Sequence, residues 1–346
     1  MPKKKHTYKQ SLDFIVETLS FDFSSEKLQH KIQTTTIDWD NFVAIASDHL
    51  ILTACYCRLQ QRQLLDFIPK DLNKYLQELT AINRNRNLTI IDELKHVTRL
   101  FDKHRINYAL LKGAALITGN FYKDIAERMV GDIDILVSRN QIALAFTLLK
   151  KAGYDKLITF NYEVKHFRHY PRQIHPERLA AIELHTSILN SNYKGYINET
   201  KFLNSTTVIN QFNIPSNYYL NIANILSLQI SSHGYRYKLW DLKHFYDSAC
   251  LSLEEQDHLP DHKYNCDYIS KFQLLFHMSE SKPLKLYSSK ISNDYKFRIE
   301  HYRLYAFFNK WRSLFYVISE RINLLIMNKS YRTHIIKNKI MLKVSP

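Results

Sequence analysis

Two stretches of the sequence, LLKGAA at residues 110–115 and GDIDILV at residues 131–137, carry its clearest structural signal. Side chains alternate along a strand, so Asp132 and Asp134 are expected on one face of the second stretch while the isoleucines enter the core. Two carboxylates on one face can share a hard cation, and Mg²⁺ is usually held by one or two carboxylates together with substrate phosphates. The pair therefore predicts a magnesium or manganese site that serves a nucleoside triphosphate.

The first stretch predicts a turn from a buried strand, residues 106–111, into a helix that begins at Lys112 and Gly113. Free backbone N–H groups and the positive end of the helix dipole meet at this turn, and glycine lets phosphate oxygens approach closely. Lys112 and Arg128 are expected to add positive charge against the triphosphate, Arg128 in bidentate fashion. The alternative for both is solvated surface charge.

A third acidic position lies in IELH at residues 182–185, which reads as a core strand. An inward carboxylate at Glu183 needs a partner, either a metal ion or a structural salt bridge. His185 falls on the same face and is expected to orient a neighbouring carboxylate rather than to bind metal directly. An Asp-x-Asp pair alone is also common on solvated strand edges, so the prediction of a site depends on the three elements together.

These elements resemble the nucleotidyltransferase superfamily of the polymerase-beta type. They are most similar to a branch of uncharacterised bacterial nucleotidyltransferase-like proteins with a Lys-Gly helix start, an Arg, an Asp-x-Asp strand and a later acidic-x-His element. The resemblance covers roughly residues 30–250, with outer parts at residues 37–39, 84–87, 233 and 240–242. The superfamily usually has Gly-Ser or Gly-Gly where this chain has Lys112-Gly113, so a serine contact to phosphate passes to Lys112 or to the backbone.

The resemblance implies transfer of a nucleoside monophosphate from a nucleoside triphosphate to a hydroxyl acceptor, with release of pyrophosphate. In that role Asp132 and Asp134 bind two divalent ions, Glu183 holds the second ion and helps to deprotonate the acceptor, and Lys112, Gly113 and Arg128 grip the triphosphate. Two alternatives stay open. The fold is either a catalytically silent nucleotide-sensing or interaction module, or a toxin-like modifier of transfer RNA or protein.

The expected fold class is α+β, a small mixed sheet flanked by helical regions. Residues 1–90 form a helical N-terminal region, residues 91–200 the nucleotidyltransferase core, and residues 201–346 a helical C-terminal region with a basic tail. Expected helices cover residues 71–103, 113–117, 141–152, 218–231, 237–251 and 268–278, and expected strands cover residues 106–111, 131–137, 156–160, 164–170 and 179–185.

The chain carries 48 Lys and Arg against 33 Asp and Glu, a net charge of +15. This excess predicts either an RNA acceptor or, because the composition is rich in Lys, Asn, Ile and Tyr, a coding bias with no nucleic-acid partner. The four cysteines, at positions 55, 57, 250 and 266, show no zinc or redox spacing and fit buried thiols in a reducing cytoplasm.

Two other features give weaker predictions. The basic start of the chain is not followed by an apolar run of signal-peptide length, so a cytoplasmic location is expected. The apolar stretch from Tyr305 to Met327 is interrupted by charges and predicts an amphipathic helix docked on the protein, not a membrane span. His166, His169 and His175 are too loosely arranged to predict a zinc site.

Overall fold

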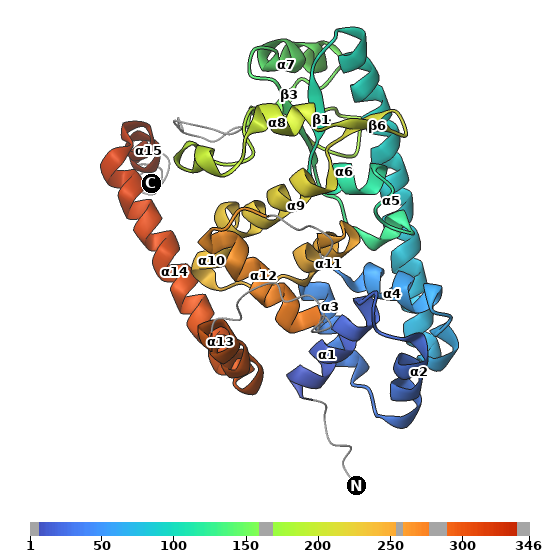
Figure 1. Ribbon diagram of the computed structural model, residues 1–346. Helices are drawn as coiled ribbons and strands as arrows, with labels where there is room; N and C mark the ends of the chain where they lie inside the picture. Colours follow the sequence, from blue (N-terminus) through green and yellow to red (C-terminus); the bar gives the residue numbers. More distant parts are fainter. Residues whose placement is uncertain (1–6, 159–168, 254–258, 277–288, 338–346) are drawn as a thin grey trace, which may run out of the picture.

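The computed structural model describes residues 7–158, 169–253, 259–276 and 289–337 (Figure 1). The chain begins with a group of helices, which are α1 (Tyr8–Leu19), α2 (Ser25–Thr34), α3 (Trp39–Asp48), α4 (Leu52–Gln61), the 3₁₀ turn η1 (Leu65–Phe67) and α5 (Lys70–Lys103). Their starts follow from capping chemistry. Thr7 and Gln10 form a capping box at α1, and Asp38 accepts the Asn41 N–H at the start of α3.

Helix α5 connects the N-terminal helices to the sheet and runs alongside both (Figure 1). It begins after Pro69, whose fixed φ suits a helix start. It is continuous over 34 residues, and its buried positions include Ile90 and Leu94. This confirms the long helix predicted from residue 71 to Lys103.

The core contains a five-stranded mixed sheet in the order β1-β2-β5-β4-β3, which confirms the predicted fold class. The strands are β1 (Tyr108–Leu110), β2 (Ile133–Val137), β3 (Lys156–Ile158), β4 (Arg172–Ile174) and β5 (Ile182–His185). Only β2 and β5 pair in parallel. The interleaved helices and turns are α6 (Lys112–Thr118), η2 (Ile125–Glu127) and α7 (Ile142–Lys151). The strand predicted at residues 164–170 lies mostly outside the described residues.

The two central strands alternate as predicted. Ile133 and Ile135 of β2 join the main hydrophobic core together with Ile182 and Leu184 of β5. The opposite face of the sheet carries Leu136, which belongs to a second, smaller core, and the polar side chains of both strands. The sheet therefore separates an apolar face from a face that carries the polar residues.

The C-terminal part of the chain is again mainly helical. It contains η3 (Ser191–Tyr196), α8 (Glu199–Asn204), the hairpin β6 (Thr207–Ile209) and β7 (Phe212–Ile214), α9 (Asn217–Leu226), the π-helical turn η4 (Ser227–Ser231), α10 (Gly234–Tyr237), α11 (Leu242–Cys250), α12 (Lys263–Phe276), α13 (Ser289–Glu300), α14 (Tyr302–Met327) and α15 (Lys329–Ile335). Helices α9 and α11 pack against each other and face the polar side of the sheet.

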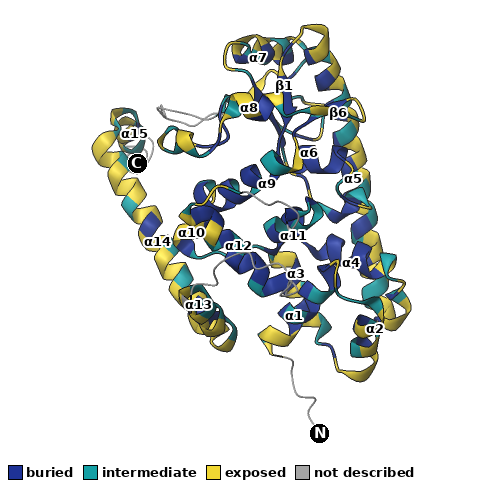
Figure 2. Ribbon diagram, viewed as in Figure 1, coloured by how far each residue is buried: buried dark blue, intermediate teal, exposed yellow. Residues whose placement is uncertain are grey.

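Helix α14 forms one edge of the molecule, and most of its surface is exposed (Figure 2). Only Tyr305 and Tyr316 of its side chains are buried. The prediction that this segment docks its apolar face on the protein is therefore wrong. The reason is that hydrophobic periodicity shows that one side of a helix is apolar but does not show which way that side faces. None of the described helices combines the length and apolarity needed to cross a bilayer.

Candidate metal and nucleotide site

Asp134 and Glu183 lie side by side because β2 and β5 pair in parallel with these two residues in register. Both side chains are buried on the polar face of the sheet, and His185 joins them two residues further along β5. His185 Nε2 donates to Asp134 Oδ1 at 2.8 Å and lies 3.4 Å from Glu183 Oε2. Ligand atoms of these three residues fall within 4.8 Å of one another, and among the described residues this is the one such group of three.

Two cationic side chains balance the acidic residues. Lys112 Nζ contacts Asp134 Oδ1 at 2.6 Å. Arg172, at the start of β4, donates from Nε to Glu183 and from Nη2 to Asp132 at 3.1 Å. The side chains of Lys112 and Arg172 are 38% and 43% exposed, so both can move away without unpacking the core. We call Lys112, Asp132, Asp134, Arg172, Glu183 and His185 the carboxylate site.

Asp132 lies one residue before β2 and is the most accessible of the three carboxylates, with a side chain 35% exposed. It is not one of the three converging ligands, and Arg172 joins it to Glu183. The structure therefore brings all three predicted carboxylates to one face of the sheet, with Asp132 at the solvent side.

The electrostatics of the site keep its inner carboxylates ionised. Burial is the largest single effect and raises the pKa of both carboxyl groups, but the combined interactions with His185 and Lys112 outweigh it for Asp134, and those with His185 and Arg172 outweigh it for Glu183. The pKa of Asp134 lies well below its usual range, and that of Glu183 is lowered to about 2. Asp132 differs, because burial and the neighbouring carboxylates outweigh Arg172 and raise its pKa. Ionised inner carboxylates are the state that a divalent cation requires.

The donor set fits Mg²⁺ or Mn²⁺. These ions prefer carboxylate oxygens, and here two buried carboxylates stand next to a third, more accessible one. The hydrogen bond from His185 to Asp134 is typical of a residue that orients a metal ligand, and that role stays a prediction. The Nδ1 atom of His185 is buried without a hydrogen-bond partner, so the ring is fixed through its Nε2 side.

The helix α6 begins at Lys112-Gly113, as predicted, and Gly113 is closely packed. A Cβ atom at Gly113 would lie 3.0 Å from Cγ2 of Val130, so any larger residue here would require the Val130 side chain in the loop before β2 to shift by a few tenths of an ångström. Lys112 itself has a left-handed backbone, with φ of 49°. This conformation turns its ammonium toward Asp134.

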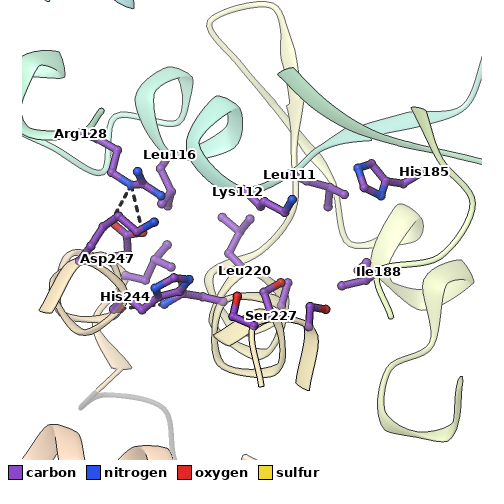
Figure 3. A pocket seen from close by; sticks show the side chains of 16 residues that line it. Leu111, Lys112, Leu116, Arg128, His185, Ile188, Leu220, Ser227, His244 and Asp247 are labelled. Atoms are coloured by element: carbon purple, nitrogen blue, oxygen red, sulfur yellow. Dashed lines mark hydrogen bonds and ion pairs between the residues drawn. The ribbon is translucent and has the colours of Figure 1, made fainter. Parts of the chain in front are cut away.

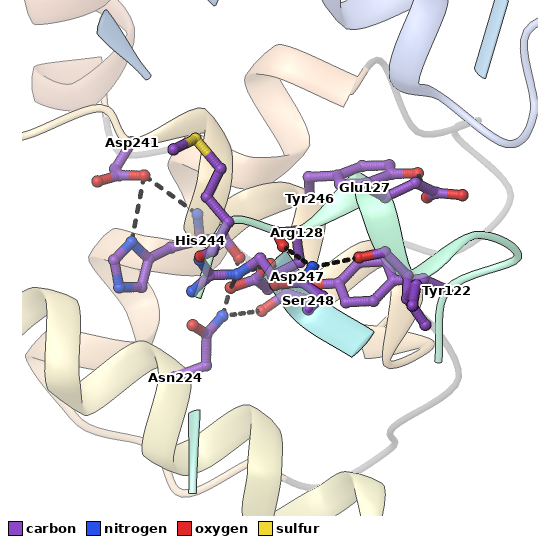
Figure 4. Close-up of polar contacts among 12 residues, drawn as sticks. Tyr122, Glu127, Arg128, Asn224, Asp241, His244, Tyr246, Asp247 and Ser248 are labelled. Carbon is purple, nitrogen blue, oxygen red and sulfur yellow. Dashed lines mark hydrogen bonds and ion pairs between the residues drawn. The ribbon is translucent and has the colours of Figure 1, made fainter. Parts of the chain in front are cut away.

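Arg128 has a different environment from the one predicted. Its guanidinium pairs with Asp247 of α11, with Nε 3.0 Å from Oδ1, and Tyr122 donates to the same carboxylate (Figure 4). Burial opposes the charge of Arg128, but Asp247 raises the pKa of its guanidinium. Next to this pair, Tyr246 donates to Glu127. We call these five residues the Arg128 network, which ties the core to the C-terminal helices.

A cavity of about 220 Å³ lies between the carboxylate site and the Arg128 network. Arg128 and Asp247 stand at one end, His185 at the other, and Lys112 between them (Figure 3). Lys243 of α11 also lines the cavity. Burial lowers its pKa, and the charge of Arg128 is the next largest cause of the decrease. Crowded cations of this kind favour an anionic ligand.

Sequence reasoning missed Arg172, Lys243 and Asp247. Arg172 falls in the basic segment around the three histidines, and nothing in its spacing pointed to the site. The histidines themselves separate, because His169 lies against the ring of His185 while His175 packs on Tyr154. The first of them, at position 166, lies outside the described residues.

Two further features of the sequence, the cysteines and residues 84–87, have clear counterparts in the structure. Cys55 and Cys57 are buried, as predicted, and burial raises the pKa of both, but Cys250 is half-buried and Cys266 is exposed, so the prediction of buried thiols is wrong for Cys266. Residues 84–87, RNRN, hold the loop that precedes β2. Asn87 donates to the carbonyls of Ile125 and Arg128, and Arg84 pairs with Asp124. Paired Arg and Asn on one face of a long helix were a sign of such a contact.

Comparison with known protein families agrees with this geometry. A family model described as uncharacterised nucleotidyltransferase matches residues 35–266, which include the whole carboxylate site and the Arg128 network. No curated protein matches the chain. The match covers well over half of the sequence, and it stops before α13. The chain belongs to this family of uncharacterised nucleotidyltransferases.

Proposed function

We propose that the protein is a metal-dependent nucleotidyltransferase that moves a nucleoside monophosphate from a nucleoside triphosphate to a hydroxyl acceptor. The observation that carries the proposal is the convergence of Asp134, Glu183 and His185 on one buried face, directly beside a cavity lined by cations. Carboxylates for a cation and cations for phosphates are the two parts that such a reaction needs in contact with each other.

The carboxylates Asp132, Asp134 and Glu183 would hold Mg²⁺ or Mn²⁺, with His185 orienting Asp134. The bound cation supplies positive charge that polarises the α-phosphate and favours the ionised acceptor oxygen. Lys112 and Gly113 would meet the triphosphate at the start of α6. Because Arg128 is paired with Asp247, its contribution would be limited to charge at the wall of the cavity, and Lys243 would add a second positive charge there.

In the proposed reaction the acceptor oxygen forms a bond to the α-phosphorus. The bond from that phosphorus to the bridging oxygen breaks, and pyrophosphate leaves with the electron pair. The hydroxyl proton passes to a carboxylate. Exposure and pKa both favour Asp132 over Glu183 for that step, since Asp132 is accessible and has a raised pKa while Glu183 is buried and strongly ionised.

The test is to incubate the purified protein with each α-labelled nucleoside triphosphate, Mg²⁺ or Mn²⁺, and cell extract. Label should move to RNA, protein or a small molecule, and which fraction it enters identifies the acceptor class. Asp134→Asn should abolish the transfer, while Asp66→Asn, at an exposed position far from the sheet in sequence, should leave it unchanged. Equal transfer by wild type and Asp134→Asn would overturn the proposal.

The ion pairs of the site favour one specific alternative, a catalytically silent nucleotide-binding module. Lys112 and Arg172 already neutralise part of the acidic charge, so a triphosphate could bind to the cations without a metal. Nucleotide binding that is independent of Mn²⁺, together with no transfer of label, would support this alternative. Binding that requires Mn²⁺ supports the transferase.

A further inference from the structure

Helix α14 carries a continuous apolar stripe that faces away from the protein. Its members are spaced by three or four residues, and each is between 39% and 73% exposed. They are Leu304, Phe307, Phe308, Trp311, Leu314, Phe315, Ile318, Ile322, Leu325 and Ile326. At 3.6 residues per turn these positions fall within a sector of about 120° that extends for most of the helix. Exposed apolar patches of this size mark a surface that is covered by something else.

The protein holds α14 by other sides of the helix. Tyr305 donates its hydroxyl to the carbonyl of Lys238 at 2.9 Å, and the guanidinium of Arg236 lies 3.9 Å from the ring centre of Tyr316. Viewed down the helix axis, these two tyrosines lie more than 100°, or roughly one third of a turn, from the middle of the stripe. The contacts to the body therefore leave the stripe free within the described structure.

Positive charges border the stripe. Arg303, Lys310 and Arg321 follow one edge, and Arg312 lies on the other; all four are exposed. From residue 302 to residue 337 there are seven Lys and Arg, at positions 303, 310, 312, 321, 329, 332 and 337, and Glu320 is the one acidic residue. An occupant of this face must be apolar at its centre and anionic at its borders.

We propose that α14 binds the surface of an anionic lipid bilayer, with the stripe at the boundary between headgroups and acyl chains. An interfacial helix has Trp, Phe and Leu on one face and Lys or Arg beside it, and it lies on the membrane without crossing it. Lipid phosphates complement the bordering cations. The described helices cannot span a bilayer, which agrees with attachment at the surface.

Two other occupants fit less well. A second copy of the chain would bring one set of bordering cations against another, with Glu320 as the one acidic residue between residues 302 and 337 to offset their repulsion. An RNA would contact the cations but would leave the stripe in water. The family match ends at residue 266, so this membrane surface is additional to the proposed transferase site and does not depend on it.

The test is flotation of the full-length protein with vesicles of pure phosphatidylcholine and with vesicles of equal parts phosphatidylcholine and phosphatidylserine. Binding should be much stronger to the second kind and should weaken with salt. Trp311 is a built-in probe, since its fluorescence should shift to shorter wavelength on binding. Trp311→Phe should remove the shift while the protein still floats.

Matched variants separate the apolar and the charged contributions. Phe315→Glu should reduce partitioning about tenfold or more, because it buries a charge in the stripe. Ile82→Glu, at an equally exposed position of α5, should have no effect. The triple variant Arg303→Gln, Lys310→Gln, Arg321→Gln should lose on the order of a hundredfold in binding to the anionic vesicles. The control is the triple variant Lys70→Gln, Lys74→Gln, Lys103→Gln in α5, which should bind the anionic vesicles as the wild type does.

Three results would overturn the proposal. The first is flotation that is the same for wild type and Phe315→Glu, provided circular dichroism shows both folded. The second is concentration-dependent dimerisation in light scattering that Phe315→Glu abolishes, with no flotation, which would assign the stripe to a second copy. The third is absence of flotation together with tight, salt-sensitive binding to RNA.

Discussion

Two buried polar clusters lie at opposite ends of one cavity, yet they are built differently. In the Arg128 network the paired side chains of Arg128 and Asp247 are 11% and 2% exposed, so both partners are enclosed. In the carboxylate site the acids Asp134 and Glu183 are enclosed, but their partners Lys112 and Arg172 reach solvent. A sealed pair fixes two parts of a fold, whereas a pair with one mobile partner can exchange that partner for a ligand. The difference assigns the first cluster to the stability of the fold and supports the proposal that a cation and phosphates bind at the second.

The contrast between the two clusters is tested most directly by a substitution at Asp247. Asp247→Ala leaves the guanidinium of Arg128 buried without its carboxylate, so the free energy of unfolding should fall by about 3–5 kcal/mol. Denaturant unfolding measures this loss, and Asp66→Ala at an exposed site should change it little. A loss below about 1 kcal/mol would mean that Arg128 is not held as tightly as the geometry indicates.

At the carboxylate site, substitution should change metal affinity more than stability. Asp134→Asn removes a metal ligand, so affinity for Mn²⁺ measured by electron paramagnetic resonance should drop by about a hundredfold. Without metal, Asp134→Asn should lower the melting temperature modestly, because His185 and Lys112 stabilise the ionised form of Asp134. Asp132→Asn should leave the melting temperature level or raise it, because burial and the neighbouring carboxylates disfavour the charge of Asp132. A large loss of stability with unchanged Mn²⁺ affinity would place Asp134 with the structural cluster instead.

Arg172 sharpens the contrast, because its charge competes with a divalent cation for Glu183 and Asp132. Arg172→Gln should raise Mn²⁺ affinity about fivefold, as expected for the loss of a half-exposed pair worth about 1 kcal/mol. Arg178→Gln is the matched control, since Arg178 pairs with Asp92 on another part of the core. If Arg172→Gln lowers the affinity, the arginine supports the metal site and does not oppose it.

Acid should weaken the carboxylate site in a defined range. The pKa of Glu183 is lowered from 4.5 to about 2 in the folded protein, so its contribution is complete above pH 4.5 and is lost as the pH falls toward 2. The decline of melting temperature over this range should be shallower in Glu183→Gln than in wild type. Identical declines would show that Glu183 is not stabilised by Arg172 and His185 in its ionised form.

Local patterns predicted much of the fold. Alternation placed Asp132 with Asp134 on one face of one strand and Glu183 with His185 on one face of another, and local patterns gave α5 and α6 nearly complete. The three predicted carboxylates also lie together, although their role as metal ligands and catalytic groups stays a prediction. The strand faces and the helices depend on neighbours within a few residues, which a sequence displays directly, whereas the meeting of the carboxylates depends on the pairing of β2 with β5.

The missed contacts depend on long-range placement. Arg172 reaches Glu183 because β4 pairs with β5 through Gln173 and Ile182, a register that residue spacing alone does not fix. Arg128 and Asp247 are 119 positions apart in the chain. The stripe of α14 was visible in the sequence, but its outward direction depends on which side of the helix the body contacts.

The left-handed backbone of Lys112 sets stability against function at this position. The left-handed conformation that Lys112 adopts costs any residue other than glycine about 1–2 kcal/mol of conformational free energy, and a glycine there would relieve this strain. That exchange would also remove the ammonium beside Asp134. A library of variants selected for heat resistance alone should drift toward glycine at this position, whereas selection for nucleotide-dependent activity should retain the lysine. Position 112 therefore separates the two selection pressures on the molecule.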